Sequence, residues 1–394
     1  MAIHFACHHF ACHIGDIQHS IFSMIPPKGA TPEGTQKFQK SHKNSVHADK
    51  WRALKEWQVS SLGLGTYLGA YDDKTDQFYE EAAGCALSGG CNLIDTAVNY
   101  RCQRSERAIG RALKRLIESK VIQRNQVVIS TKGGFIPFDS QPVTQMEAYI
   151  RKKWLDRGIV TSDDIIASCH CMHPTYLQEQ IDLSLSNLGL DTIDIYYLHN
   201  PETQLPVVGE EIFYERLIKA FALFEENAAK GKIQYYGLAT WTAFREPAGV
   251  AEHIPLHRVI EAAERAGGAD HHFQVLQLPY NMAMLEAVSV SNQTLQGKSC
   301  PILPAATAHK ISVMTSAPLL QSQLLNLPST LARQLPDSLT LVQKALQFVV
   351  STPGITAAMT GMKKKEHVEE NLKVLNHPNW DLPTLQKICE LLVK

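Results

Sequence analysis

The sequence predicts an α/β protein built as a (β/α)8 TIM barrel. From Trp51 onward, short runs of apolar and β-branched residues alternate with longer segments whose apolar residues recur at helical spacing. This alternation is typical of parallel strands joined by helices. Because barrels of this kind routinely exceed the length of an average domain, we expect residues 51–394 to form one domain.

Each predicted strand is a short apolar run that ends at glycine, proline or a polar residue. The strands are expected at residues 62–65, 92–95, 127–132, 193–198, 235–239, 273–278, 311–315 and 355–360. Helices are expected at residues 74–89, 106–117, 174–187, 210–230, 255–266, 338–350 and 365–375. A short hairpin is expected before the first strand, at residues 51–60, and an additional amphipathic helix at residues 382–393.

Residues 1–50 differ in composition from the rest of the chain. The first part is crowded with histidine and cysteine, and the remainder is polar with Pro26-Pro27. The candidate zinc ligands are Cys7, His8, His9, Cys12 and His13. Their spacing matches no paired metal-binding motif, and the start lacks the basic residues of a secretory signal. We therefore favour a disordered leader over a metal site for residues 1–50.

The overall composition argues for an ordinary soluble globular protein. Hydrophobic residues make up 44% of the chain and the formal net charge is -1, which gives no argument for binding to nucleic acid or a membrane surface. No run approaches the roughly 18 apolar residues of a membrane span. The nine cysteines follow no framework spacing, so we expect reduced thiols and a cytoplasmic location. The oligomeric state cannot be derived from these features.

Three ionisable residues stand at the ends of predicted strands, and a tyrosine follows one of them. Asp95, Lys132 and His199 each end an apolar run, and Tyr100 lies shortly after Asp95. A charged residue at the end of a buried strand is costly unless it is paired or functional. Because the carboxyl ends of parallel barrel strands meet at one rim, we expect these four side chains to converge.

Such a cluster can transfer a proton. An ammonium beside a phenol favours the phenolate, so Lys132 is expected to lower the pKa of Tyr100, while Asp95 keeps the lysine charged. Tyr100 can then donate a proton to a carbonyl oxygen, or accept one from an alcohol, with His199 orienting the same oxygen. The structural alternative is a buried Asp95–Lys132 salt bridge with two unrelated rim residues.

In these residues and their order, the chain resembles the aldo-keto reductase family. The resemblance rests on Asp95-Thr96-Ala97 with Tyr100, on Ser130-Thr131-Lys132 and on Leu198-His199, and it covers roughly residues 55–376. It implies that Asp95, Tyr100, Lys132 and His199 form a catalytic tetrad. It also implies that the hairpin closes the bottom of the barrel.

The resemblance further implies a nicotinamide cofactor, with NADP(H) favoured over NAD(H). The residues it assigns to cofactor binding are Thr240, Gln277, Ser316, Lys363, Lys364, His367 and Asn371. The two lysines lie at a predicted helix start, which suits an anion such as the adenosine 2′-phosphate, although a lysine run can also be merely solvated. Three positions depart from the family pattern. Ala239 and Ser316 replace nicotinamide-contacting residues, and His367 stands where many members have arginine.

The connection at residues 133–174 is much longer than the roughly 4–6 residues typical of such loops. We expect it to contain a helix at residues 145–157 and to shape the substrate pocket. The aromatic candidates for that pocket are Phe135, Trp241, Phe244 and Tyr280, which rim packing would explain equally well. Cys169, Cys171 and His173 alternate, which allows a metal trio or a strand packed at the barrel mouth. We favour the strand and predict no metal site.

Two hypotheses of function follow. The first is an NADP(H)-dependent oxidoreductase that reduces an aldehyde or ketone, sugars included, to an alcohol, or runs the reverse reaction. The second is a catalytically weak NADP(H)-binding regulatory protein on the same barrel, which only Ala239 and Ser316 support. The complete tetrad favours the first hypothesis, because a protein that only binds the cofactor does not need a tyrosine next to a lysine.

Overall fold

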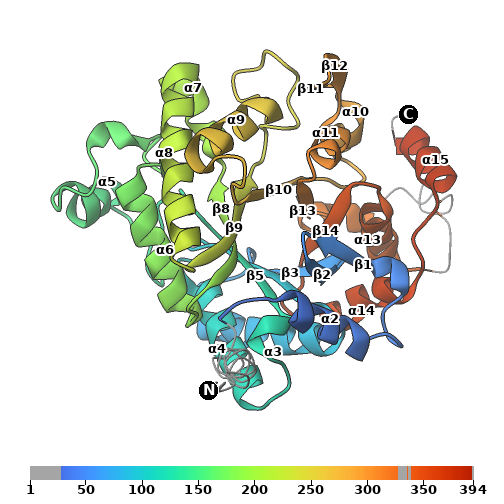
Figure 1. Ribbon diagram of the computed structural model, residues 1–394. Helices are drawn as coiled ribbons and strands as arrows, with labels where there is room; N and C mark the ends of the chain where they lie inside the picture. The colour runs from blue at the N-terminus through green and yellow to red at the C-terminus, as the bar shows by residue number, and fades with distance from the viewer. Residues whose placement is uncertain (1–27, 327–334, 336–338, 393–394) are drawn as a thin grey trace, which may run out of the picture.

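The chain folds into a closed barrel of eight parallel strands surrounded by helices (Figure 1). The computed structural model describes residues 28–326, 335 and 339–392. The strands are β3 (Leu62–Gly65), β4 (Leu93–Asp95), β5 (Val128–Gly133), β8 (Ile193–His199), β9 (Ile233–Ala239), β10 (Phe273–Pro279), β13 (Ser312–Ser316) and β14 (Ile355–Gly361). They follow one another around the barrel in chain order, and β14 returns to pair with β3. The predicted fold class is therefore confirmed.

Helices connect successive strands on the outside of the barrel (Figure 1). They are α3 (Asp73–Ser88), α4 (Arg104–Glu118), α6 (Pro174–Leu188), α8 (Glu210–Ala229), α9 (Leu256–Gly267), α11 (Ile302–Ala308), α13 (Leu341–Ser351) and α14 (Lys365–Leu372), followed by α15 (Leu382–Leu392). Helix α11 was not predicted, because its seven residues are too few to show helical periodicity. The short elements α7 (Leu205–Val208), α10 (Glu286–Ser289), β11 (Gln293–Leu295) and β12 (Lys298–Cys300) lie in loops and were also missed.

The register of the sheet brings the three strand-end residues to one rim. Asp95 pairs with Gly65 on one side and with Ser130 on the other, at the last residue of β4. Lys132 stands one residue before the end of β5, and His199 is the last residue of β8. Because all the strands run parallel, these ends share the carboxyl face of the barrel, where barrel enzymes have their active sites.

The opposite end of the barrel is closed by the predicted hairpin. Strands β1 (Trp51–Leu54) and β2 (Trp57–Ser60) pair antiparallel. The side chains of Leu54, Trp57 and Val59 are fully buried. They form one apolar cluster with inward residues of the barrel strands, Val128 and Ile195 among them. The hairpin therefore acts as an apolar plug at the amino face.

The expectation of a disordered segment through residue 50 is wrong for residues 28–50. Helix α2 (Pro32–Ser41) begins after Thr31, whose side chain caps the helix by accepting a hydrogen bond from Gly34 N. Phe38 on this helix is 2% exposed and packs into the main core. The polar composition concealed this order, because only a few contacts hold the segment: the helix cap, the buried side chains of Phe38 and Val46, and the hydrogen bond from Ala30 N to Asp194. The candidate zinc ligands between Cys7 and His13 lie outside the described residues.

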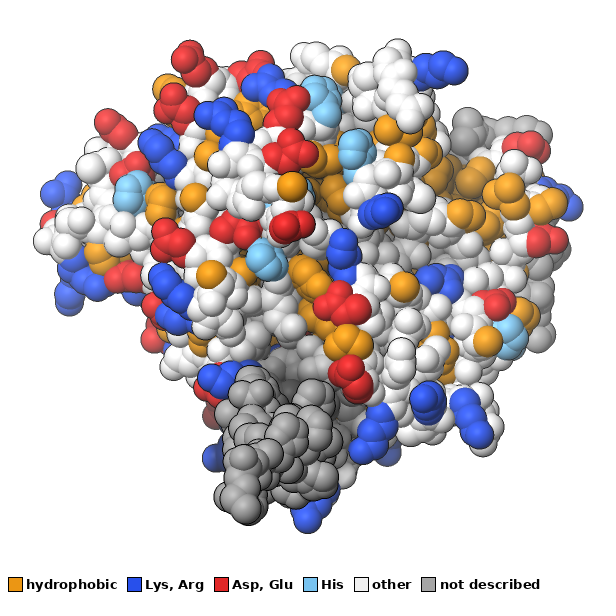
Figure 2. Space-filling view, in the orientation of Figure 1, with side chains coloured by type: hydrophobic (Ala, Val, Ile, Leu, Met, Phe, Trp, Pro, Cys, Tyr) orange, Lys and Arg blue, Asp and Glu red, His pale blue; other side chains and the backbone are white. Residues whose placement is uncertain are grey.

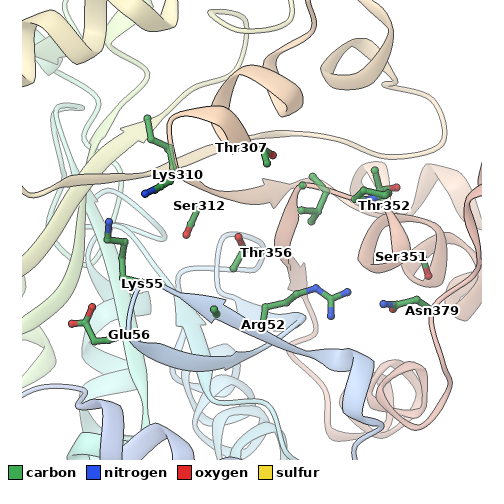
Figure 3. A pocket seen from close by; sticks show the side chains of 15 residues that line it. Arg52, Lys55, Glu56, Thr307, Lys310, Ser312, Ser351, Thr352, Thr356 and Asn379 are labelled. Carbon is green, nitrogen blue, oxygen red and sulfur yellow. The ribbon is translucent and has the colours of Figure 1, made fainter. Parts of the chain in front are cut away.

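A cavity of about 820 Å³ opens at the amino face, beside the hairpin (Figure 3). Its lining includes Arg52 and Lys55 of the hairpin region and Lys310 of the loop before β13. In Figure 3, Lys55 and Lys310 extend toward the same part of the cavity, whereas Arg52 extends toward Asn379. Lys55 and Lys310 are exposed to solvent. This cavity is therefore accessible to solvent and lies at the end of the barrel opposite the tetrad.

The long connection after β5 folds over the carboxyl face. Its predicted helix appears as α5 (Met146–Ile150) continued by a π-helical turn, Arg151–Leu155. Two short strands follow, β6 (Ile165–Ile166) and β7 (His170–Cys171), and they pair antiparallel. A strand is thus present where we favoured one over the metal trio, but it includes only Cys171 of the three candidates. Within the described ranges, no group of three His, Cys, Asp or Glu side chains is arranged to hold a metal ion.

Basic and acidic side chains are mixed over the visible face of the molecule (Figure 2). None of the described helices combines the length and the apolar character needed to cross a bilayer. All seven cysteines in the described ranges are free thiols.

Candidate active site

A buried ion pair lies at the centre of the carboxyl face. The Lys132 Nζ atom donates to Asp95 Oδ2 at 2.6 Å and to the carbonyl oxygen of Thr96 at 2.8 Å. Asp95 also accepts hydrogen bonds at its Oδ1 atom, from Ser130 Oγ at 2.7 Å and from Gln277 Nε2 at 2.9 Å. Lys132 is fully buried and Asp95 nearly so. The carboxylate, at the end of β4, is therefore held by donors from the neighbouring strand β5 and from β10 across the barrel.

The electrostatics of this pair differ from the prediction for Tyr100. Burial raises the pKa of Tyr100 well above its ordinary value, and the nearby Asp95 carboxylate raises it further. Burial also lowers the pKa of Lys132, an effect that its ion pair with Asp95 opposes. The expectation that Lys132 depresses the pKa of Tyr100 is thus wrong for the unliganded site. Asp95 compensates the lysine charge, and desolvation penalises the phenolate.

Tyr100 and His199 face each other beside the ion pair. Their ring centroids are 5.8 Å apart, and the Lys132 ammonium lies 4.8 Å from the centroid of the Tyr100 ring. Among the described residues, the Tyr100 hydroxyl forms no hydrogen bond, so it is available to a ligand oxygen. Burial, and secondarily Lys132, lowers the pKa of His199 well below its ordinary value, so the imidazole is neutral. A neutral ring can donate one hydrogen bond to the same oxygen.

A cavity of about 540 Å³ opens over these groups. The predicted site residues that line it are Asp95, Tyr100, Phe135, His199, Thr240, Trp241, Gln277 and Ser316. Lys132 does not line the cavity; it lies beneath it and contacts two lining residues, Asp95 and Tyr100. The four tetrad candidates are therefore brought together, as the strand-end argument predicted.

The residues assigned to the adenosine end lie beyond this cavity. Its lining extends along the end of β14 to Gly361 and stops there. Lys364 occupies the N-cap position of α14 without a side-chain capping bond and is exposed, as is His367, whereas Lys363 is half-buried. Asn371 is buried, and its side-chain nitrogen lies 3.7 Å from Met362 Sδ. The lysines thus continue the line of the cavity without lining it, and their cofactor role stays a prediction.

Two of the predicted pocket aromatics are core residues instead. Tyr280 is 1% exposed; its ring stacks on Phe348 and its hydroxyl lies 3.2 Å from Thr352 Oγ1. Phe244 is fully buried in the main apolar cluster. Both residues follow strand ends, but the backbone turns their side chains outward into the helix layer. The prediction that they shape the substrate pocket is wrong, whereas Phe135 and Trp241 do line the cavity.

Other residues of the site were not predicted. Tyr67, in the loop after β3, lines the cavity, and its ring centroid lies 5.0 Å from that of Tyr100. Glu202 is buried beneath Trp241 and accepts a hydrogen bond from Trp241 N at 2.6 Å. Its other oxygen, Oε2, has no partner among the described residues, and burial raises its pKa to about 7. Position shortly after a strand end was the signal that could have identified both Tyr67, after β3, and Glu202, after β8.

A (β/α)8 barrel that gathers an Asp–Lys pair, a tyrosine and a histidine over one cavity is typical of oxidoreductases acting on carbonyl groups. The chain belongs to the aldo/keto reductase family, whose profile matches residues 61–390.

Individual relatives resemble the chain only distantly. A probable voltage-gated potassium channel subunit beta of Arabidopsis thaliana is 22% identical over 335 residues, which cover 81% of this chain and 88% of the relative. The NADH-specific methylglyoxal reductase of Escherichia coli is 31% identical over 186 residues, covering 46% of this chain and 48% of that protein. An aldo/keto reductase of Klebsiella pneumoniae, solved with NADP and acetate, superposes with a TM-score of 0.59 at 20% identity, covering 87% of this chain and 95% of that one.

The lining of the cavity fits the nicotinamide end of a nicotinamide cofactor such as NADP. The Gln277 side chain donates to Asp95, which leaves its carbonyl oxygen without a donor among the described residues and free to accept from a carboxamide. The Thr360 Oγ1 atom, at the end of β14, is buried without a partner in the described part of the chain. Thr240 is less available, because its hydroxyl already lies 3.4 Å from the Gln277 carbonyl oxygen.

Proposed function

We propose that this protein is an NADP(H)-dependent oxidoreductase that interconverts an aldehyde or ketone and the corresponding alcohol. The observation that carries the proposal is the Tyr100 hydroxyl, which has no hydrogen-bond partner among the described residues and belongs to a ring facing neutral His199 beside the buried Asp95–Lys132 pair. Family membership supports oxidoreductase chemistry. Phe135 and Trp241 give the cavity an aromatic wall, which suits a small carbonyl compound.

When bound, the nicotinamide cofactor supplies or accepts the hydride. Tyr100 supplies the proton to the carbonyl oxygen during reduction and removes it from the alcohol during oxidation. His199 donates a hydrogen bond to the same oxygen and so stabilises the negative charge that develops there. The Lys132 ammonium, 4.8 Å from the ring centroid, offsets part of the cost that burial and Asp95 impose on the tyrosinate left after proton transfer. Asp95 keeps that ammonium in place.

The preference for NADP(H) rests on Lys363 and Lys364. They follow the last cavity residue of β14, and Lys364 stands at the helix start, where an anion is favoured. NADP is the cofactor in the Klebsiella structure, whereas the related Escherichia coli reductase is named as NADH-specific. The two lysines favour the phosphorylated cofactor on charge alone.

The test is NADPH and NADH consumption with a panel of aldehydes, ketones and sugars, comparing wild type with Tyr100→Phe. Loss of the phenolic proton donor should lower kcat by about 10²-fold or more, while cofactor affinity changes little. Equal rates in the two proteins would contradict the role of Tyr100. NADPH binding without turnover in the wild type would instead favour the regulatory alternative, which the likeness to a potassium channel subunit also supports.

A further inference from the structure

A second histidine, His170, lies directly behind the tetrad histidine. It belongs to β7 in the long connection after β5, and its side chain is fully buried. The backbone of this strand is tied to the end of β5, because Cys171 N donates to Gly134 O at 2.9 Å and Ile136 N donates to Cys169 O at 2.7 Å. The connection thus places one imidazole against the last residue of β8.

A directional chain of hydrogen bonds fixes the state of this imidazole. Arg216 Nη1 donates to Gln204 Oε1 at 2.9 Å, and the Gln204 Nε2 atom lies 3.1 Å from His170 Nδ1. Because a guanidinium can only donate, the amide of Gln204 must present its N–H groups to the histidine. His170 Nδ1 is therefore the acceptor, and Nε2 carries the proton that is donated to the His199 carbonyl oxygen at 2.7 Å. Burial lowers the pKa of His170 to about 4, so the ring is neutral at physiological pH.

The surrounding residues are arranged to accommodate this bond. Gly134 has a φ of 132°, and a Cβ atom there would lie 2.8 Å from His170 Nε2 and 3.2 Å from His199 O. A glycine at this position therefore leaves the space through which the two histidines meet. The Phe135 ring packs edge-on against both imidazoles, with centroid distances of 5.2 Å to His170 and 5.0 Å to His199.

The His199 side chain has little polar restraint of its own. Its Nδ1 atom is buried and has no hydrogen-bond partner among the described residues. The orientation of the ring is thus set by packing against Phe135 and Tyr100 and by the position of its own backbone. His170 does not line the active-site cavity, so it touches neither substrate nor cofactor there.

We propose that His170 is a positioning residue, which Arg216 and Gln204 hold in one tautomer so that it anchors the end of β8 and keeps the His199 imidazole opposite Tyr100. The role rests on the proposed oxidoreductase function, because it serves the hydrogen bond of His199 to the substrate oxygen. The long connection after β5 thereby supports the geometry of the catalytic site in addition to covering it.

The test compares His170→Gln with His170→Leu. The glutamine amide nitrogen can occupy the place of His170 Nε2 and donate to the His199 carbonyl, whereas leucine fills the space without a donor. His170→Leu should lower kcat by about 10-fold to 100-fold, because small displacements of a catalytic group are costly, while the Kd for NADPH stays within about twofold. His170→Gln should recover most of the loss.

A matched control is available in His253, whose Nε2 atom lies 2.7 Å from the carbonyl oxygen of Asn292 outside the cavity. His253→Leu removes a comparable bond and should leave kcat within about twofold. If folded His170→Leu retains wild-type kcat, or if His170→Gln is as impaired as His170→Leu, the proposal is overturned. Should His170→Leu fail to fold, Gln204→Leu provides a second test, because it removes the hydrogen bond that keeps the His170 proton on Nε2. Wild-type kcat in that variant would also overturn the proposal.

A measurement independent of turnover separates this proposal from the proposed function. In histidine-selective NMR spectra, the His199 ring signals, identified with His199→Gln, should shift in His170→Leu and stay near their wild-type positions in His170→Gln. Unshifted signals in His170→Leu would overturn the positioning role. A wild type that turns over no carbonyl substrate would count against the proposed function and leave the NMR result decisive for His170.

Discussion

The two ends of the barrel both carry lysines next to a cavity, yet their surroundings differ. At the carboxyl face Lys132 is fully buried and its ammonium lies 2.6 Å from Asp95. At the amino face Lys55 and Lys310 border the larger cavity but are exposed, and neither has an ion pair within the described ranges. Cavity size therefore does not indicate where the chemistry is. The desolvation of charged groups indicates the reactive site, because it shifts their pKa values and strengthens each polar contact.

Buried charge also occurs at the amino face, with a different result. Asp194, near the start of β8, accepts hydrogen bonds from Ala30 N, Ile129 N, Gln234 Nε2 and Arg124 Nη2, each at 2.7 Å. Every oxygen of this carboxylate is satisfied by fixed donors. At the carboxyl face, in contrast, Glu202 Oε2 is buried without a partner among the described residues, and the Tyr100 hydroxyl forms no hydrogen bond to them and belongs to a residue that lines the cavity. The hydrogen bonds of Asp194 stabilise the fold, whereas the Tyr100 hydroxyl is available to a ligand in the cavity.

The largest difference between the two ends should appear on replacing Lys132. Lys132→Met leaves Asp95 buried without its counter-ion and removes the charge beside Tyr100, so kcat/KM should fall by about 10³-fold. The loss of one partner of a buried pair should also reduce the free energy of unfolding by about 3–5 kcal/mol. Steady-state NADPH oxidation and urea denaturation measure the two effects. Activity within tenfold of wild type would contradict the proposed role of the ion pair.

Replacing Asp194 should affect stability and leave catalysis unchanged. In Asp194→Asn an amide N–H faces donors, and the Arg124 guanidinium loses its carboxylate, so the free energy of unfolding should fall by about 3–5 kcal/mol. The kcat of the remaining folded protein should not change. Asp182→Asn is the control, because its ion pair with Lys232 is largely solvent-exposed and should contribute no more than about 1 kcal/mol. A fall in kcat for Asp194→Asn would show that the two ends are coupled.

A smaller, pH-dependent effect is expected for Glu202. Its pKa is raised in the folded state to about 7, so its protonated form is favoured on folding. The stability that this proton contributes is fully present below the pKa that Glu202 has in the unfolded chain. It is lost as pH rises through the folded-state pKa of about 7. Between pH 5 and 8, wild type should therefore lose on the order of 3 kcal/mol relative to Glu202→Gln, which cannot ionise. Parallel pH dependences of the two melting temperatures would refute this.

The smallest effect should come from the lysines of the amino-face cavity. The double replacement of Lys55 and Lys310 by methionine removes exposed charges without ion-pair partners. It should change kcat/KM by less than about twofold and stability by less than about 0.5 kcal/mol. The same substitution at Lys132 is the internal comparison. A marked change in kcat/KM would mean that the amino-face cavity influences the active site.

The fold and the tetrad could be predicted because they depend on short-range signals. Apolar runs locate strands, and parallel strands necessarily bring their carboxyl ends together, so Asp95, Lys132 and His199 converge without further information. Tyr280 shows that position after a strand is not enough to assign a residue to the cavity. It also follows a strand, but the direction of its side chain depends on local backbone geometry that residue type does not encode.

The remaining errors involve contacts between residues far apart in the sequence. The pKa of Tyr100 depends on how completely Asp95 balances Lys132 and on how little water remains, which only packing determines. Helix α2 contains few apolar residues, and its order depends on Phe38 packing and on the hydrogen bond from Ala30 to Asp194. His170 lies between Cys169 and Cys171 and was given no role of its own, because its partners Gln204 and His199 follow in later elements.

The residue that joins α2 to the hairpin region has a consequence for how the chain is synthesised and folds. Lys50 is fully buried, and its ammonium donates at 2.9 Å to Gln347 Oε1 and to Asn379 Oδ1. Both acceptors are translated long after the lysine, as is β14, which closes the barrel against β3. Until those segments are synthesised, the Lys50 ammonium is hydrated and the edge of β3 that pairs with β14 stays open. Contacts of such high sequence separation slow folding, and an unpaired strand edge is prone to aggregation until the barrel closes.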